Sequence, residues 1–473
     1  MMQNYKDLKE KILDMMDRSK ETGLNSACLD TVRVFLSYCD DRLSPEEYDD
    51  EEQAFFRSLS GCLIAEKNKD SLGKEAYSRI NADFYRVRIK LEGGSCLSTK
   101  QCYLACVSSY AEKAVVVPEE SIEENAQPIA YMNEAVSIFA AMTDEEKQDS
   151  GTCYYIGEIF YQLGLVWADF DAIKSLAYFR DMLSVIEGGK RCLIEEYGNS
   201  DEEAAQFIAN RAIAVNWAFS EMFERSEDPD ESDRMEAMWA EILEKWLPMI
   251  DQYTDRDRED EGSLSALINS YYTMGERASK QDAYAYYEKA NEIGRKRFAG
   301  FGDIYPPFLA FGFYSMALSS SGAKEKAALE MALLVYQLIT VMDPADESAA
   351  TSFRLLKERK RIRGDIYGET GNIEYIRLLN EYVEDWGKGL VRLELYKDAA
   401  VAYRFAQAEA RRTAVHENTD TARRLQYLTA KRFIDFTEEY KDVLPMNYQL
   451  TVAALKNETE ELGKSLGTEA EGK

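Results

Sequence analysis

Apolar residues recur every three or four positions along most of this chain. In one representative segment the apolar positions are Ile173, Leu176, Phe179, Leu183 and Ile186. This spacing places them on one face of an α-helix. No segment alternates with the two-residue period of a strand, and the run Val115–Val117 stops at Pro118, where a helix from Thr99 would end. The pattern therefore predicts an all-α fold.

Short polar and acidic segments interrupt the helical pattern. They lie at 118–127, 143–150, 198–203, 226–233, 255–262, 300–307 and 343–348. Between these breaks, helical pairs recur about 40 to 60 residues apart, which is typical of stacked hairpins rather than of one globular bundle. We therefore expect an α-α superhelix, that is, a solenoid of helical hairpins.

The expected organisation has four parts. An N-terminal helical region covers residues 1–118, helical repeats cover 128–390, a C-terminal hairpin or cap covers 391–460, and a flexible tail covers 461–473. The end of the chain is expected to be disordered because Thr468–Lys473 is small and charged.

A glycine–aromatic–glycine motif recurs in the first helix of several expected hairpins. Two sets have the full motif, and a third has isoleucine in the first position. They are Gly157, Phe160 and Gly164; Gly364, Tyr367 and Gly371; and Ile268, Tyr271 and Gly275. The first glycine leaves a gap in which the second helix packs closely, and the aromatic residue fills the same face. The last glycine is expected to end the helix.

The residues after these motifs strengthen the repeat interpretation. Ala283–Ala290 and Leu176–Leu183 combine small residues with paired aromatics at second-helix spacing, and Asp343-Pro344 follows a later helix. Between Gly151 and Trp386, the chain resembles a degenerate form of the tetratricopeptide-repeat family. The resemblance implies a curved surface of stacked hairpins that binds another protein or an extended peptide.

In that family, the ligand faces the inner side of the first helices. The matching positions here are Tyr154, Glu158, Tyr161 and Gln162 in one repeat, Asn269, Tyr272 and Thr273 in another, and Asp365 and Glu369 in a third. The resemblance therefore implies that these residues contact the partner.

Charge narrows the classes of function. The chain has 57 Lys and Arg against 86 Asp and Glu, which gives a net charge of −29. Such a charge repels nucleic-acid phosphates and anionic membrane surfaces, so we expect no direct nucleic-acid or membrane partner. The longest apolar stretch, Met331–Met342, is also far shorter than the ~20 residues that cross a bilayer.

Side chains that support catalysis or metal binding are sparse. The single histidine, His416, lies where a helix is expected to end and has no partner set for a nucleophile. Asp257–Gly262 resembles the start of a calcium loop, but Ile268 replaces the bidentate Glu that such a loop needs. Cys102 and Cys106 share a helix face but lack the further ligands that zinc requires. We expect no enzyme activity, metal or cofactor.

The cysteines indicate a reducing compartment. All eight precede residue 193, and most lie within apolar helical patterns, as buried thiols do. A secreted disulfide scaffold would be shorter and richer in cysteine, and Met1–Lys20 has no signal-peptide pattern. We therefore expect a cytoplasmic protein.

Charge is distributed unevenly. Glu195–Glu261 contains 21 acidic and 6 basic residues, whereas Thr351–Tyr440 contains 15 acidic and 17 basic residues. The second region includes a basic patch formed by Arg354, Lys357, Arg359, Lys360, Arg361 and Arg363. Opposite charges at separate places would orient an elongated partner, although solvated helix faces would produce the same pattern.

These observations favour a non-catalytic scaffold or adaptor that binds another protein or an extended peptide, including one with basic segments. The alternative is a peptide-responsive regulator of the same architecture, which would become more compact when a short ligand binds. An acidic mimic of nucleic acid and an enzyme that uses paired carboxylates are two further hypotheses, which the net charge and the many acidic residues leave open.

Overall fold

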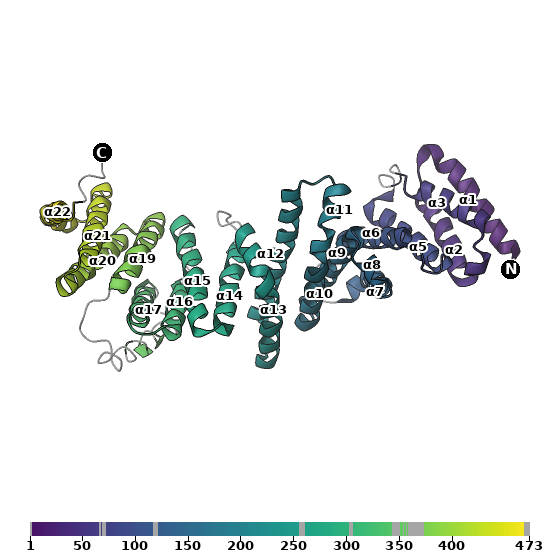
Figure 1. The fold of residues 1–473 in the computed structure, drawn as a ribbon. Helices are drawn as coiled ribbons and strands as arrows, with labels where there is room; N and C mark the ends of the chain where they lie inside the picture. The colour runs from purple at the N-terminus through teal and green to yellow at the C-terminus, as the bar shows by residue number, and fades with distance from the viewer. Residues whose placement is uncertain are drawn as a thin grey trace. The chain divides into compact units, whose positions relative to one another are not determined.

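The chain is all-α throughout the part that the structure describes. The computed structural model describes residues 2–65, 68, 72–116, 122–254, 261–301, 306–342, 351–352, 354–355, 357 and 373–467 (Figure 1). Within each part of the chain, many helices that follow one another pack together, and none of the described residues forms a strand. The predicted all-α fold of packed helical hairpins is therefore confirmed. The chain divides into two compact units, Met1–Ile242 and Leu243–Lys473.

The first unit extends from α1 into α13. Its longer helices are α1 (Met2–Thr22), α2 (Ser26–Arg42), α3 (Asp50–Leu63), α5 (Lys74–Leu91), α6 (Leu97–Ala114), α7 (Ala126–Ala140), α9 (Ser150–Trp167), α10 (Ala172–Val185), α12 (Asp201–Arg225) and α13 (Pro229–Tyr253). Its shorter segments are η1 (Pro45–Glu47), η2 (Ile122–Asn125), α8 (Asp144–Lys147), η3 (Ile186–Gly189) and α11 (Lys190–Glu195). The pairs α5–α6 and α9–α10 form hairpins, and α6 also packs against α9, so neighbouring hairpins share a core.

The second unit is centred on α19. Its helices after α13 are α14 (Glu261–Arg277), α15 (Lys280–Phe301), α16 (Pro306–Ser319), α17 (Ala323–Met342), α19 (Ile373–Arg392), α20 (Tyr396–Glu417), α21 (Asp420–Glu439) and α22 (Met446–Leu466). Helix α19 packs against α15, α17, α20 and α21. Its fully buried Trp386 lies 4.5 Å from the ring centroid of Phe298 on α15, and this stack anchors α19 in the core.

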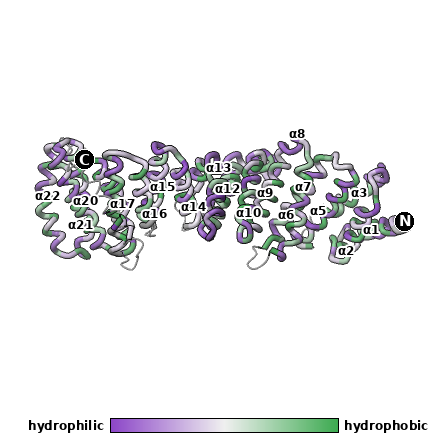
Figure 2. The backbone as a smooth tube through the Cα atoms, turned by 90° about the horizontal axis from the view of Figure 1, so that it is seen from below, coloured by the Kyte–Doolittle hydropathy of each residue, from purple (hydrophilic) through white to green (hydrophobic). Residues whose placement is uncertain are grey.

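Amphipathic helices account for both cores. Hydrophobic and hydrophilic positions alternate along the helices in Figure 2, as the three- and four-residue spacing predicted. No helix within the described ranges is long and apolar enough to cross a membrane.

Several of the polar breaks supply helix caps. Asp149 accepts hydrogen bonds from the backbone N–H groups of Gly151 and Thr152 at the start of α9. Ser200 and Glu203 form a reciprocal capping box at the start of α12. These side chains satisfy backbone donors that have no partner within the helix. The breaks at 143–150 and 198–203 therefore fix where α9 and α12 begin.

Glycines in three hairpins make room for an aromatic ring of the next helix. A Cβ atom at Gly164 would overlap the Phe179 ring, and one at Gly275 would lie 2.6 Å from the Tyr287 ring. In the same way, Gly387 on α19 receives Tyr403 of α20. These residues are glycine because any side chain would push the paired helices apart.

The structure confirms the expected gap at Gly157 but corrects the expected role of the last motif glycine. A Cβ at Gly157 would lie 2.9 Å from Ile186 Cδ1, so the next segment does pack into this gap. Gly164 and Gly275, however, do not end their helices, because α9 continues to Trp167 and α14 to Arg277. Both glycines accommodate a ring instead. The motif at 364–371 lies outside the described residues.

The thiols and the histidine lie largely where they were expected. All eight cysteines are free, with three buried and the other five partly exposed, so the prediction of buried thiols is only partly correct. His416 lies in the last turn of α20, which ends with Asn418 in the left-handed conformation. A positive charge at that end would interact favourably with the helix dipole.

A pair of glycine-to-alanine substitutions tests the ring contacts. Both changes raise helix propensity by up to about 1 kcal/mol. Gly61 of α3 has open space around it, so Gly61→Ala should stabilise the protein. Gly164→Ala adds a methyl group that overlaps Phe179, so it should be less stable than Gly61→Ala by about 1–3 kcal/mol. Thermal and urea unfolding measure both, and equal stability would contradict the proposed role of Gly164.

Candidate functional site

Three of the predicted partner-binding residues in α9 lie where α9 meets α12. Arg211 of α12 donates two hydrogen bonds to the Glu158 carboxylate, at 2.8 and 2.5 Å. The Arg211 guanidinium also lies 4.3 Å from the centroid of the Tyr161 ring. Tyr154 packs beside Phe207, and Gln162 is partly buried further along α9. The structure thus brings Tyr154, Glu158 and Tyr161 together in a contact between hairpins.

The predicted residues of α14 differ in their exposure. Tyr272 is buried between Tyr287 and Phe311, and this burial raises the pKa of its hydroxyl. Asn269 and Thr273 are partly exposed on the same helix. Of the three, Asn269 and Thr273 are therefore better placed than Tyr272 to reach a partner.

The remaining predicted residues lie mainly outside the described part of the chain. The candidate residues not described are Asp365, Glu369, Arg359, Lys360, Arg361 and Arg363. Arg354 and Lys357 of the predicted basic patch are described, and both are exposed.

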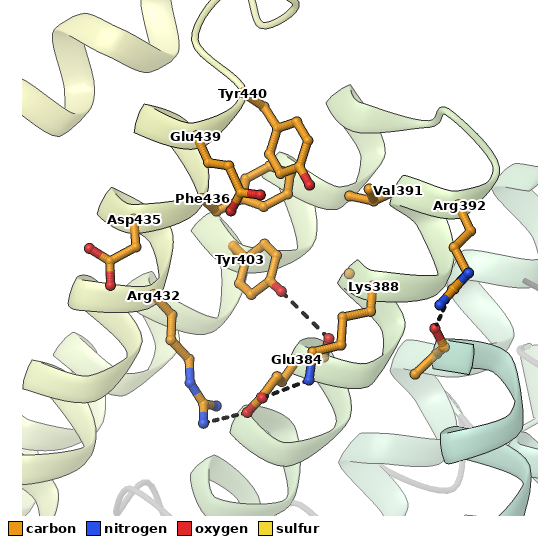
Figure 3. Close-up of a pocket in the computed structure, with 12 residues that line it drawn as sticks. Glu384, Lys388, Val391, Arg392, Tyr403, Arg432, Asp435, Phe436, Glu439 and Tyr440 are labelled. Carbon is orange, nitrogen blue, oxygen red and sulfur yellow. Dashed lines mark hydrogen bonds and ion pairs between the residues drawn. The ribbon is translucent and has the colours of Figure 1, made fainter. Parts of the chain in front are cut away.

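The second unit contains a cavity of about 520 Å³ that opens beside α19 (Figure 3). Its walls come from α15, α19, α20 and α21, and we call it the α19–α21 cavity. The residues that line it are Ala299, Glu384, Gly387, Lys388, Val391, Arg392, Tyr403, Arg432, Asp435, Phe436, Glu439 and Tyr440. None of these was among the predicted partner-binding residues.

Three aromatic rings form an apolar wall of the α19–α21 cavity. The Phe436 ring centroid lies 4.8 Å from that of Tyr403 and 4.9 Å from that of Tyr440. Tyr403 extends over Gly387, and burial raises its pKa to about 12, so its hydroxyl is neutral at physiological pH. The wall can therefore accept an apolar side chain and still offer tyrosine hydroxyl groups.

Charged side chains occupy the rest of the cavity wall. The Glu384 carboxylate accepts a hydrogen bond from Lys388 at 2.9 Å and pairs with Arg432 at 2.5 Å. The Lys388 hydrogen bond in particular holds the pKa of Glu384 below its usual value. Asp435 and Glu439 are one turn apart on α21 and exposed, and no described cation pairs with either. Two carboxylates thus remain available to a ligand at one side of the cavity.

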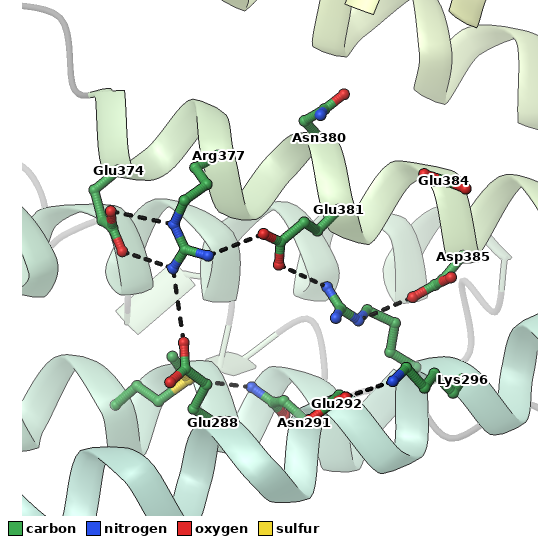
Figure 4. A network of polar contacts seen from close by, with 12 residues as sticks. Glu288, Asn291, Glu292, Lys296, Glu374, Arg377, Asn380, Glu381, Glu384 and Asp385 are labelled. Carbon is green, nitrogen blue, oxygen red and sulfur yellow. Dashed lines mark hydrogen bonds and ion pairs between the residues drawn. The ribbon is translucent and has the colours of Figure 1, made fainter. Parts of the chain in front are cut away.

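A line of ion pairs joins α19 to α15 on a neighbouring face (Figure 4). Arg377 binds Glu374 and Glu381 at 2.8 and 2.9 Å and approaches Glu288 of α15 at 3.7 Å. Arg295 of α15 lies 3.0 Å from Asp385 and 3.4 Å from Glu381. Charges on the two helices therefore alternate along their contact.

The ionisation of Asp385 depends on this contact. Burial raises the pKa of Asp385 above its usual value, whereas the nearby Arg295 opposes the shift. Without Arg295, this largely buried carboxylate would lose its direct ion pair, and only the weaker influence of Lys388 and Lys296 would remain. The Arg295–Asp385 ion pair contributes to stability mainly because removing one partner leaves the other charge partly buried and unpaired, which lowers the free energy of unfolding.

The described residues were also searched for side chains that could bind a metal ion. No group of three His, Cys, Asp or Glu side chains within the described residues is arranged to hold a metal ion. In comparisons with known proteins, no family model matches this chain and no curated protein matches it.

A double-mutant cycle tests the α15–α19 contact. Arg295→Met should destabilise the protein by about 2 kcal/mol because it removes the direct ion-pair partner of Asp385. Asp385→Asn should cost less, since Arg295 keeps Glu381 as a partner. The double variant should lose about 1 kcal/mol less than the sum of the single losses. Urea unfolding measures all three, and strictly additive losses would contradict coupling between the two side chains.

Proposed function

We propose that this chain is a non-catalytic scaffold or adaptor that binds an extended peptide segment of another protein. The observation that carries the proposal is the α19–α21 cavity, in which an aromatic wall lies beside two exposed carboxylates. A solvent-open cavity with an apolar wall beside charged side chains can hold a peptide side chain together with its charged neighbours. The proposal extends to a TPR-like repeat architecture, which the recurring glycine–ring contacts support.

The charges suggest how such a peptide would lie. An apolar side chain would rest on Phe436 and the adjoining tyrosines, where it would lose its contact with water. A neighbouring Lys or Arg of the peptide would pair with Asp435 and Glu439. Lys388 and Arg392 line the same cavity from α19 and would attract an acidic group or the carboxyl end of the segment.

Two residues of α14, the free cysteines and the net charge add to the proposal. Asn269 and Thr273 of α14 would form a second contact area for the same partner, since both are partly exposed. The cysteines are all free, which supports a reducing cytoplasmic location. The net charge of −29 supports a partner with basic segments and disfavours nucleic acid.

Selection from a random displayed peptide library tests the proposed function. Peptides that bind the full chain should combine an aromatic or aliphatic residue with a nearby Lys or Arg. The double variant Asp435→Lys/Glu439→Lys should weaken their binding at least about tenfold, because like charges would then face each other. Fluorescence anisotropy with a labelled selected peptide measures the affinity.

A matched control is available on α22. Glu460 and Glu461 are both exposed, so Glu460→Lys/Glu461→Lys changes the net charge equally at a different surface. This variant should bind the peptide nearly as well as the wild type does. Failure to select any peptide would contradict the proposed function, whereas equal weakening by both double variants would rule out the α19–α21 cavity as its site.

One feature favours the alternative of a peptide-responsive regulator. The cavity walls belong to four helices, and Arg392 donates to the Ala299 carbonyl at 3.0 Å while Arg432 pairs with Glu384. A peptide that touches several walls would change their spacing. In this case small-angle scattering should show a smaller radius of gyration with the selected peptide, and unchanged dimensions would favour the plain scaffold.

A further inference from the structure

Helix α20 exposes apolar side chains on the face opposite to its buried one. Val401 is 51% exposed, Phe405 is 40% exposed and Val415 is 76% exposed. Ala408, which lies between them in the sequence, is exposed as well. The buried face carries Tyr403, which lines the α19–α21 cavity. Helix α20 therefore has apolar residues on both faces, although the outer face of a surface helix is usually polar.

The exposed residues follow the spacing of a coiled-coil seam. From Val401 they recur after four, three, four and three residues, at Phe405, Ala408, Arg412 and Val415. This is the a/d pattern of two heptads, which places the five residues in one line along the helix, about 21 Å long. We call this line the α20 seam. Because all five residues are exposed, none of the described helices packs on the seam.

Arginines lie in and beside the α20 seam. Arg412 is one of the seam residues, and Arg404 and Arg411 occupy the flanking g positions. Arg404 is exposed and forms no ion pair within the described ranges. Arg411 pairs with Glu458 at 3.2 Å and Arg412 with Glu409 at 2.9 Å, but both arginine side chains are more than half exposed. Exposed pairs of this kind contribute little to stability, so these arginines can exchange one carboxylate for another.

The local charge has the opposite sign to that of the whole chain. Residues 404–431 contain six basic and three acidic residues, whereas the net charge of the chain is −29. At physiological salt, exposed charges act over about 8 Å, so the nearby arginines determine which partner approaches the seam. In coiled coils, the charges at the e and g positions select the partner helix. Arginines at g therefore favour a helix with Glu or Asp at the matching positions.

We infer that the α20 seam binds an amphipathic helix of another protein, with apolar residues at its a and d positions and acidic residues at e and g. A second copy of this chain fits the seam less well, because two α20 helices would bring their arginines together. An anionic membrane also fits less well, because helices that lie on membranes have a broad apolar face and the seam is narrow. This inference does not rest on the α19–α21 cavity, which takes Tyr403 from the other face of α20.

Binding of designed peptides to the full chain tests the inference. The probe is a fluorescein-labelled helix of three heptads with Leu at a and d and Glu at e and g, because these like charges keep the peptide from pairing with itself. Its fluorescence anisotropy should rise saturably as the chain is added at physiological salt. A second peptide keeps the Glu residues but has Gln at a and d, and it should not bind. No binding of the first peptide, or equal binding of both, would overturn the inference.

Two variants locate the contact on α20. Phe405→Gln removes the largest apolar side chain of the seam and should weaken binding of the first peptide at least about tenfold. Arg404→Glu places a like charge beside the Glu residues of the peptide and should weaken binding about fivefold. Both residues are exposed, so the fold should persist. The matched controls are Leu13→Gln and Lys11→Glu on the exposed side of α1, and they should bind as the wild type does. Equal weakening by a seam variant and its control would contradict binding at the seam.

Two further measurements distinguish the other occupants. Sedimentation velocity of the chain alone detects self-association, and cosedimentation with phosphatidylglycerol vesicles detects membrane binding. Neither should occur through the α20 seam. Self-association or vesicle binding that is present in the wild type and lost in Phe405→Gln would assign the seam to that occupant and show the inference to be wrong.

Discussion

The arrangement of helices in the second unit depends on how α19 packs against its neighbours. On its apolar side, Tyr382 and Trp386 are buried against α15 and α16, with Trp386 stacked on Phe298. On its polar side, Arg377 and Asp385 pair across to α15. Ion pairs that are partly removed from water stabilise a contact mainly by penalising any arrangement that separates them. The position of α19 is therefore specified by hydrophobic burial and by charge together.

Two cavities follow from that position. The α19–α21 cavity takes Glu384, Gly387 and Lys388 from α19, whereas a smaller cavity between α15, α16 and α19 takes Leu378 and Glu381 from the same helix. The helix thus supplies side chains to two openings with different chemistry. One has an aromatic wall beside exposed carboxylates, and the other combines buried apolar side chains with charged residues that are paired with one another. A change in the position of α19 would therefore alter both cavities.

The local features of this chain could be predicted from its sequence, but the sites could not. Helical periodicity identified the helices, and the motif at Gly157 identified a gap that Ile186 fills. Gly164 was misassigned because glycine both ends helices and admits a close neighbour, and only the position of Phe179 distinguishes these roles. The pattern of a single helix does not reveal which ring of the next helix it will meet.

The candidate sites depend on contacts between residues far apart in the chain. Glu158 was predicted as a partner-binding residue, and nothing local to α9 indicates that Arg211 pairs with it. Residues 391–460 were expected to form a cap, although Tyr403 and Phe436 within them form a cavity wall. Val401, Phe405 and Val415 have the spacing of buried residues, and only the structure shows that they are exposed. Sequence patterns predict which residues share a face, but not which faces remain uncovered.

The glycine–ring contacts also bear on how such repeats can diverge. The same contact joins Gly164 to Phe179, Gly275 to Tyr287 and Gly387 to Tyr403, although the number of residues between glycine and ring differs in each hairpin. The loop between the two helices can therefore lengthen or shorten while the glycine–ring contact persists, provided that a substitution of one of the two residues is matched by a substitution of the other. A linear motif of constant spacing would miss repeats of this kind, whereas paired substitutions at the two positions would reveal them.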